Sequence, residues 1–355
     1  MPELPEVETI RRDLDAKLRG ARIRNVEVRL AKIVFPHGSA FARALRGVVI
    51  RGIRRRGKLL VFDMERYPSQ RHLPRRQVHS SHKIKTVQFY GIGRLVMLIH
   101  LKMTGQLVLR HHKQIIFGGH TIVGAHELPN KYTHVIFYFT PLENASRLAA
   151  GSGGSIRVPL ETQSLTGRAR RSMSRASSLT GVTNGDTLYF NDLRQFGYLK
   201  LVTSEQAQKI LDEYGLEPLS RDFTLEKFAE ILKKRKSGKL KSVLMDQSLF
   251  AGIGNIYADE SCFLARVRPG RRAASLKGKE LRTLWRSIKS VLKLSIKHRG
   301  TSFNTYVDSQ GQAGNFVKYL KVYGRGNKPC KVCGTILKKT VLAGRGTVFC
   351  PTCQK

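Results

Sequence analysis

Two cysteine pairs near the C-terminus constrain the fold of this chain more than any other feature. Cys330 and Cys333 form one CxxC motif, Cys350 and Cys353 form a second, and residues 334–349 separate them. A tetrahedral zinc ion takes four thiolates, and each CxxC turn presents two of them at a suitable separation. The spacing therefore predicts one structural zinc ion in a small ribbon, with no open coordination position for a substrate.

The rest of the cysteine pattern agrees with a metal site. Cysteines in two tight pairs suit a reducing compartment better than disulfide bonds, and the fifth, Cys262, is expected to be a buried thiol. Between the pairs, the stretch from Gly344 to Thr347 predicts a hairpin tip that projects Arg345. A guanidinium there suits a phosphate, although the pattern alone favours an ordinary exposed turn.

The charge of the chain points to a polyanionic partner. It carries 64 Lys and Arg residues against 25 Asp and Glu residues, a formal net charge of +39. Nucleic acid is the commonest partner of such a chain. Charge alone leaves open a basic scaffold that only binds nucleic acid. The sequence has no run of eighteen apolar residues and an acidic N-terminus, which argue against a transmembrane helix and a secretory signal.

The hydrophobic pattern predicts a mixed α+β chain. Val7, Ile10 and Leu14 recur at helical spacing in a segment that ends before Gly20. Short β-rich runs follow and predict a β-sandwich or flattened barrel; they are 22–29, 48–53, 58–64, 95–101, 106–109, 135–139, 187–190 and 198–202. Helices are then expected over 225–236, 241–246, 255–264 and 279–297.

These patterns divide the chain into three expected domains. They are a β domain over 1–205, a helical domain over 206–320 and the cysteine ribbon over 321–355. Two stretches of the β domain, about 68–90 and 144–183, resemble solvated insertions. No function is assigned to their histidines, His72, His79 and His82.

Two further segments carry chemistry. Glycines in the run from Gly252 to Asn255 would let the backbone approach a ligand, and Asn255 would cap a helix whose amides face a phosphate. A plain helix connection is the alternative.

The N-terminus is the second of these segments. Removal of Met1 would free the secondary amine of Pro2, a nucleophile able to form an iminium with an aldehyde sugar. Glu3 and Glu6 lie within one helical turn of this amine, close enough to transfer protons to or from it. The alternative is that the two carboxylates only complement the dipole of the helix.

Together these motifs resemble the formamidopyrimidine-DNA glycosylase family. The resemblance rests on PELPEVETIRR at 2–12, HLKMTGQL at 100–107, NDLRQFG at 191–197, MDQSLFAGIGNIYADE at 245–260 and the cysteine ribbon from VYGRGNKPCKVCG to GRGTVFCPTCQ. It covers the chain apart from the two insertions. It implies an N-terminal helix with a β-sandwich, a helix–two-turns–helix domain and a C-terminal β-ribbon zinc finger.

The resemblance also implies catalytic roles. Pro2 would attack C1′ of a damaged nucleotide and form a Schiff base, Glu3 would act as general acid and base, and Glu6 would support the site. Lys58, expected in a strand, would assist proton transfer and bind phosphate. Arg345 would serve the second elimination step, which leaves a one-nucleotide gap flanked by phosphates.

DNA contacts are implied as well. An enzyme that flips a base out of a duplex must fill the space it leaves, and Met103, Arg194 and Phe196 match the residues that do so. Lys236 and Asn255 match positions that hold the DNA backbone. Tyr132 stands where the family often has a DNA-contacting histidine, so this chain departs from the pattern there.

The implied activity is excision of oxidised purines from damaged double-stranded DNA, followed by strand cleavage. Leu4, Met103 and the segment Thr301–Tyr319 favour purines over oxidised pyrimidines, which remain the alternative substrate. A silent DNA-binding zinc-ribbon protein is the second alternative. The resemblance further implies a monomer in the cytoplasm, associated with the nucleoid.

Overall fold

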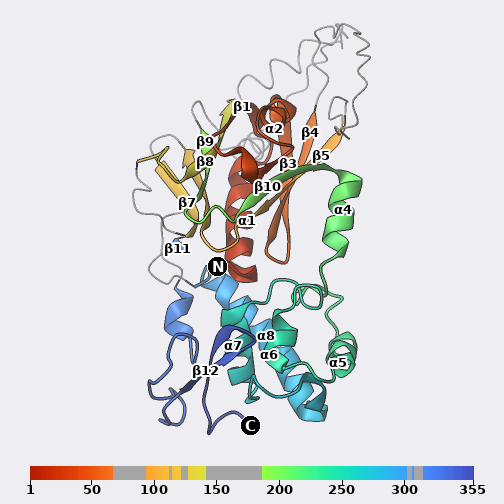
Figure 1. Ribbon diagram of the computed structural model, residues 1–355, viewed down its shortest axis with the longest axis vertical. Coiled ribbons are helices and arrows are strands. Elements are labelled where there is room, and N and C mark those ends of the chain that lie inside the picture. Colours follow the sequence, from red (N-terminus) through yellow and green to blue (C-terminus); the bar gives the residue numbers. More distant parts are fainter. Residues whose placement is uncertain (67–92, 112–113, 121–126, 141–185, 302–305, 308–314) are drawn as a thin grey trace, which may run out of the picture.

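The computed structural model describes residues 1–66, 93–111, 114–120, 127–140, 186–301, 306–307 and 315–355. Both expected insertions and the three histidines noted above lie outside these residues. Within them, an upper half of strands and a lower half of helices are stacked along the long axis of the molecule (Figure 1).

The N-terminal helix is confirmed as α1 (Leu4–Leu18). Its apolar residues Val7, Ile10, Leu14 and Leu18 are buried in the core of the upper half. A capping box starts the helix, because the Glu3 side chain accepts from the backbone of Glu6 while the Glu6 side chain accepts from the backbone of Glu3. The helix stops before Gly20, whose φ of 85° favours glycine.

The β-sandwich is confirmed, and each of the eight expected runs forms a strand. In the described part of the upper half, eleven strands form one hydrogen-bonded sheet, in the order β11-β7-β6-β9-β8-β1-β3-β4-β5-β10-β2. Their bounds are β1 (Arg22–Val28), β2 (Val34–Phe35), β3 (Val48–Arg56), β4 (Leu59–Arg66), β5 (Arg94–His100), β6 (Gly105–His111), β7 (Gln114–His120), β8 (Thr133–Thr140), β9 (Thr187–Asp192), β10 (Tyr198–Thr203) and β11 (Tyr306–Val307).

This sheet is folded over at its middle. Strands β1 and β3 are paired at Arg22 and Val49, and the rest of the sheet continues on either side of that junction. Phe137 and Phe190 from one side pack in the same core as Phe62 and Ile99 from the other, together with α1 and α2 (Ser39–Leu45). The two sides therefore face each other as the layers of a sandwich.

The lower half is helical, as expected. Helix α4 (Ser204–Asp212), which the sequence did not predict, packs on β4, β5 and β10 of the sandwich, and the helices of the lower half are α5 (Leu225–Lys234), α6 (Leu240–Met245), α7 (Asn255–Leu264) and α8 (Gly278–Lys297). They bury a second core, which includes Phe228, Phe250, Tyr257 and Ile288. Leu4 of α1 belongs to this core rather than to that of the sandwich, so the first turn of α1 joins the two halves. None of the helices in the described part of the chain is long and apolar enough to span a bilayer.

The C-terminal ribbon consists of β12 (Lys338–Leu342) and β13 (Arg345–Phe349), joined by a two-residue turn. Its small core holds Leu337, Val348 and two of the cysteines, and packs on Phe263 of α7. Arg345 begins β13 directly after the turn and is exposed, in agreement with the expected hairpin.

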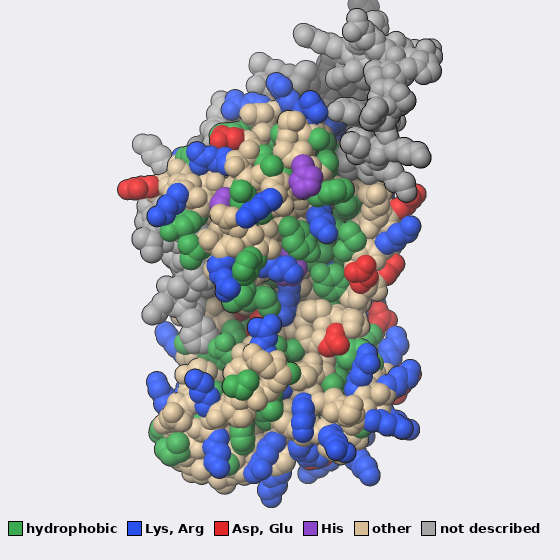
Figure 2. Space-filling model, viewed as in Figure 1, with side chains coloured by type: hydrophobic (Ala, Val, Ile, Leu, Met, Phe, Trp, Pro, Cys, Tyr) green, Lys and Arg blue, Asp and Glu red, His purple; other side chains and the backbone are tan. Residues whose placement is uncertain are grey.

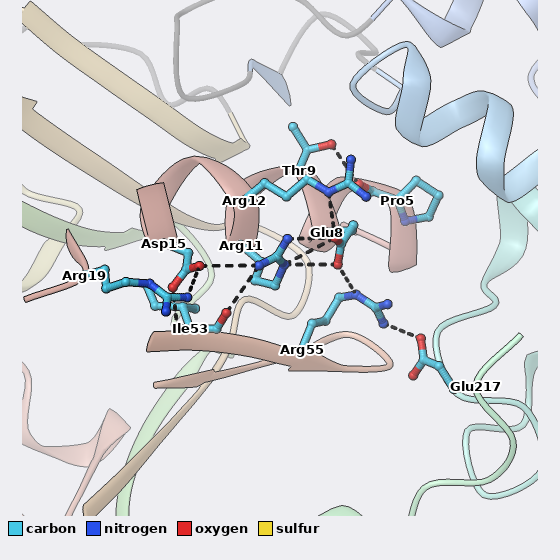
Figure 3. A network of polar contacts seen from close by, with 10 residues as sticks. All are labelled: Pro5, Glu8, Thr9, Arg11, Arg12, Asp15, Arg19, Ile53, Arg55 and Glu217. Carbon is cyan, nitrogen blue, oxygen red and sulfur yellow. Dashed lines mark hydrogen bonds and ion pairs between the residues drawn. The ribbon is translucent and has the colours of Figure 1, made fainter. Parts of the chain in front are cut away.

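A buried ionic network fixes the β3–β4 turn against both halves (Figure 3). Arg55 lies between two carboxylates: its Nε is 3.0 Å from Glu8 Oε2 of α1, and its Nη1 is 2.5 Å from Glu217 Oε1 of the linker after α4. Glu217 also accepts from the amide of Gly57 at 2.9 Å. Since Arg55 is only 9% exposed, this network holds the turn firmly.

Candidate active site and DNA interface

The Glu3 carboxylate lies at the N-terminus of α7. Its Oε1 accepts from the amide of Ile256 at 3.0 Å and its Oε2 from that of Tyr257 at 3.4 Å. A β carbon at Gly254 would lie 2.3 Å from the Glu3 carboxyl carbon, so a larger residue there would displace this carboxylate. The GIGN run therefore brings a helix N-terminus onto a carboxylate of the protein itself.

The pKa of Glu3 lies above its usual value. Burial raises it, the Lys58 ammonium opposes that rise, and the Glu6 charge adds to it. Glu3 is only 2% exposed. A carboxyl group with a raised pKa holds its proton to a higher pH than an ordinary one and can deliver that proton to a bound molecule. Pro2 precedes it directly and is also buried.

The Glu6 carboxylate accepts hydrogen bonds from the start of α1, from α7 and from the segment after α8. Its Oε2 accepts from the amide of Glu3 at 2.9 Å, and its Oε1 accepts from Tyr257 Oη at 2.5 Å and from the amide of Thr301 at 2.8 Å. The Tyr257 hydroxyl also lies 2.6 Å from Ser295 Oγ of α8. Glu6 thus positions the start of α1, as a supporting residue would.

Lys58 lies in the β3–β4 turn, so its expected place in a strand is wrong. The run RRRGKLL turns at Gly57, whose φ of 56° suits glycine, and β4 begins at Leu59. Gly57 packs against Ala251 and Gly252, which leaves room for no larger residue without movement of its neighbours. Burial lowers the pKa of Lys58, and the Glu3 and Glu6 carboxylates oppose that effect while Arg345 and Lys102 add to it.

The fold brings charged residues from four distant segments of the chain close to one another. Lys58 lies near Glu3 and Glu6 of α1, Arg345 of the ribbon and Lys102 after β5. His100 belongs to this cluster and escaped the sequence reasoning, although it opens the HLKMTGQL motif. Burial first, and then Lys102 and Lys58, lower its pKa to about 3, and its Nδ1 accepts from the amide of Lys102 at 2.9 Å. The end of β5 therefore places a neutral histidine beside the cations Lys58 and Lys102.

Met103, Arg194 and Phe196 lie together on the surface. The Arg194 Nη1 is 3.1 Å from Met103 Sδ, and its guanidinium carbon is 4.7 Å from the Phe196 ring centroid. Met103 is 38% and Phe196 53% exposed. Below them the buried carboxylate of Asp192 accepts from the amides of Arg194 and Gly197. Two exposed apolar side chains with a guanidinium between them are suited to insert between stacked bases of DNA.

The remaining expected DNA contacts are dispersed. Lys236 is exposed just beyond α5, which ends at Lys234 rather than at residue 236. Asn255 is the first residue of α7, so Gly254, and not Asn255, occupies the N-cap position. Tyr132 is half-buried, with Lys131 5.2 Å from its ring centroid, and its carbonyl accepts from the amide of Asp192.

A buried ion pair fixes the ribbon that carries Arg345. Lys241 of α6 is 1% exposed, and its Nζ lies 2.8 Å from Asp259 Oδ1 of α7. The same ammonium donates to the Gly346 carbonyl at 2.9 Å and to Thr347 Oγ1 at 2.8 Å, while Asp259 Oδ2 accepts from the amide of Val348. Sequence reasoning missed this pair because the two residues are paired only by tertiary structure.

Replacing Lys241 with methionine is expected to destabilise the protein by about 3–5 kcal/mol, because it leaves Asp259 buried without its counter-charge. Urea unfolding of the DNA-free protein would measure the loss. In the double variant Lys241→Met/Asp259→Leu, most of the stability should return, since no buried charge remains. A loss as large in the double variant as in the single one would contradict this account.

The four cysteines of the ribbon meet the requirements of a zinc site. Their sulfur atoms lie within 4.8 Å of one another, with Cys333 and Cys350 Sγ 3.5 Å apart. Four sulfur donors in this arrangement fit one tetrahedral zinc ion. Cys262 lies buried in α7, apart from this cluster, and burial raises the pKa of its thiol. The structure thus supports one structural zinc ion and an inert fifth cysteine.

Comparisons with known proteins agree along the whole chain. Residues 1–151 match the formamidopyrimidine-DNA glycosylase N-terminal domain, residues 214–307 its H2TH domain, and residues 327–355 a zinc finger found in FPG and IleRS. The formamidopyrimidine-DNA glycosylases of Heliobacterium modesticaldum and Listeria monocytogenes are 36% and 34% identical to the chain, and each alignment covers all of both proteins.

Solved structures give the same result. The Lactococcus lactis Fpg in complex with DNA containing an abasic site matches with a TM-score of 0.70 and 27% identity, over 99% of each chain. The same protein in complex with DNA containing N7-benzyl-Fapy-dG matches with a TM-score of 0.70 and 26% identity, over 100% of each chain.

Proposed function

The chain belongs to the formamidopyrimidine-DNA glycosylase family and is an oxidised-purine DNA glycosylase of base excision repair, and we propose that its nucleophile is the amine of Pro2. One observation supports this assignment above the others. The buried Glu3 carboxyl, with its raised pKa, adjoins Pro2 and lies among α7 amides and the Lys58 charge. Such a carboxyl is suited to transfer protons beside an amine nucleophile.

In the proposed reaction the Pro2 nitrogen attacks C1′ of the flipped nucleotide. The new nitrogen–carbon bond replaces the glycosidic bond; the base leaves with its bonding electrons and takes up a proton, and the Pro2 nitrogen loses its own proton. Glu3 protonates the sugar ring oxygen, so the ring opens to an iminium. Loss of a proton from C2′ then expels the 3′ phosphate, and a second elimination expels the 5′ phosphate.

The other site residues take supporting roles. Glu6 holds the Glu3 backbone, and Lys58 assists proton transfer and binds a phosphate together with Arg345, which serves the second elimination. Met103, Arg194 and Phe196 fill the space left by the flipped base. Lys236, Asn255 and Tyr132 contact the DNA backbone. The zinc ion fixes the ribbon that presents Arg345. We further propose a monomer that acts on nucleoid DNA in the cytoplasm, since all these groups come from one chain.

The test of the nucleophile is borohydride trapping on a duplex with one 8-oxoguanine opposite cytosine. The native chain, shown by intact mass to lack Met1, should form a covalent adduct, and the Pro2→Gly variant should form at least about tenfold less, because its primary amine is a poorer match to the site. Both proteins should bind a duplex that carries a stable abasic analogue equally well. An equal yield of adduct from the variant would exclude Pro2 as the nucleophile.

Two outcomes would redirect the functional assignment. An adduct with a thymine glycol duplex but none with 8-oxoguanine would favour the pyrimidine branch. Binding without an adduct on either lesion would favour a silent DNA-binding protein.

A further inference from the structure

A second potential binding site lies in the helical half, between α5 and α8. It is a pocket of about 400 Å³. Phe223 and Trp285 form its apolar floor: their rings are stacked with centroids 6.3 Å apart, and Trp285 Nε1 donates to the Phe223 carbonyl at 3.0 Å. The pocket shares no residue with the catalytic cluster. Arg286 is nine residues before Ser295, the contact of Tyr257, or about 14 Å along the axis of α8.

The rim of this pocket is cationic. Arg221, Arg282, Arg286 and Lys289 line it, and Lys289 Nζ lies 4.3 Å from the Trp285 ring centroid. Within the described ranges, none of these four cations has an acidic partner, in contrast to Arg55 or Arg271, each of which binds a carboxylate. Glu226 is the single acidic residue of the lining and is exposed at its edge. The rim therefore presents an excess of uncompensated positive charge.

The rim is part of a longer basic face. Every third or fourth residue of the exposed side of α8 is Lys or Arg, namely Lys279, Arg282, Arg286, Lys289, Lys293 and Lys297. Lys and Arg side chains gather over the lower, helical half of the molecule on the side drawn in Figure 2. At the pocket this charge lies around the half-buried ring of Trp285.

We propose that this pocket binds an acidic peptide segment of a partner protein, with an aromatic side chain of the peptide on Trp285 and its carboxylates on the rim. Charge complementarity selects an anionic partner. The aromatic floor selects a partner with an apolar side chain, because such anchors in pockets supply most of the affinity of an interface. A DNA backbone would satisfy the cations but would leave the apolar floor and its pocket unfilled.

The sequence provides its own probe, because Trp285 is the only tryptophan of the chain. The full-length protein would be titrated at low salt with an acetylated peptide of several aspartates and a C-terminal phenylalanine, while Trp285 emission is recorded. Binding should change the emission, and the affinity should fall with added salt. The same peptide with alanine in place of phenylalanine should bind about tenfold more weakly.

Matched charge reversals test the location. Arg286→Glu, at the rim, should weaken the peptide about tenfold, whereas Lys293→Glu, about two turns further along α8 and outside the pocket, should change its affinity less than about threefold. Excision of 8-oxoguanine should be equal in the two variants.

Three results would overturn the proposal. One is unchanged Trp285 emission at saturating peptide. Another is that both variants weaken peptide binding equally, which would show that only the overall positive charge of α8, and not the pocket, attracts the peptide. The third is displacement of the peptide by undamaged duplex together with a larger loss of duplex binding in Arg286→Glu, which would assign this face to DNA.

Discussion

Replacing Glu3 with glutamine is expected to slow excision of 8-oxoguanine by about 10³-fold, within the range for loss of a positioned general acid. Glutamine keeps the shape of the side chain and one oxygen acceptor for the α7 amides of Ile256 and Tyr257. The change therefore removes the transferable proton and largely spares the packing. Single-turnover kinetics on a duplex with one lesion would measure it.

The pH dependence gives an independent readout of the same residue. Burial raises the pKa of Glu3, and only its protonated form can act as an acid, so the native rate should fall as pH rises through that raised pKa. This decline should be missing from the residual activity of the glutamine variant. The exposed Glu27→Gln is the matched control and should keep native rate and pH profile. A Glu3→Gln rate within threefold of the native rate would exclude this role.

Removing the zinc ion is expected to abolish the second elimination step. A two-stranded hairpin is marginal by itself, and the core of the ribbon is small, so metal binding must supply most of its folding free energy. Without the ion, β13 and Arg345 lose their fixed place near Lys58. The sandwich and the helices have their own cores and should stay folded.

The Cys330→Ser variant tests this without a chelator. We expect it to contain less than one zinc ion per chain, to lose amide protection in β12 and β13, and to stop at the first elimination product. The control is Cys262→Ala, which should keep its zinc and form the gapped product, because Cys262 lies outside the cluster. A gapped product from the zinc-free variant would show that Arg345 acts without the ribbon.

The sequence predicted best what local patterns determine. The expected helix over 255–264 matches α7 at both ends, since glycines precede it and apolar residues fill it. Short elements with weak periodicity, such as α2 and β2, were missed. Lys58 was placed in a strand because alternation alone cannot reveal that Gly57 turns the chain with a positive φ.

Of the site, sequence reasoning named the residues expected to carry chemistry and one expected to support them, Glu6, but not the buried contacts that hold the ribbon and the end of β5. The resemblance provided Pro2, Glu3 and Arg345, whereas no pattern indicated that Lys241 and Asp259 form a buried pair. His100 was overlooked because a lone histidine after a strand has no distinctive spacing. These contacts join segments far apart in the chain, and single-sequence periodicity carries no information about them.

The hydrogen bonds between Glu3 and the first amides of α7 have a consequence for biosynthesis. The Glu3 carboxyl meets these amides only after residues 256 and 257 have been made, so a nascent chain that ends before α7 lacks the surroundings in which Glu3 is buried. We therefore expect a truncated product that ends before α7 to lack both the positioned general acid and the helices that follow it.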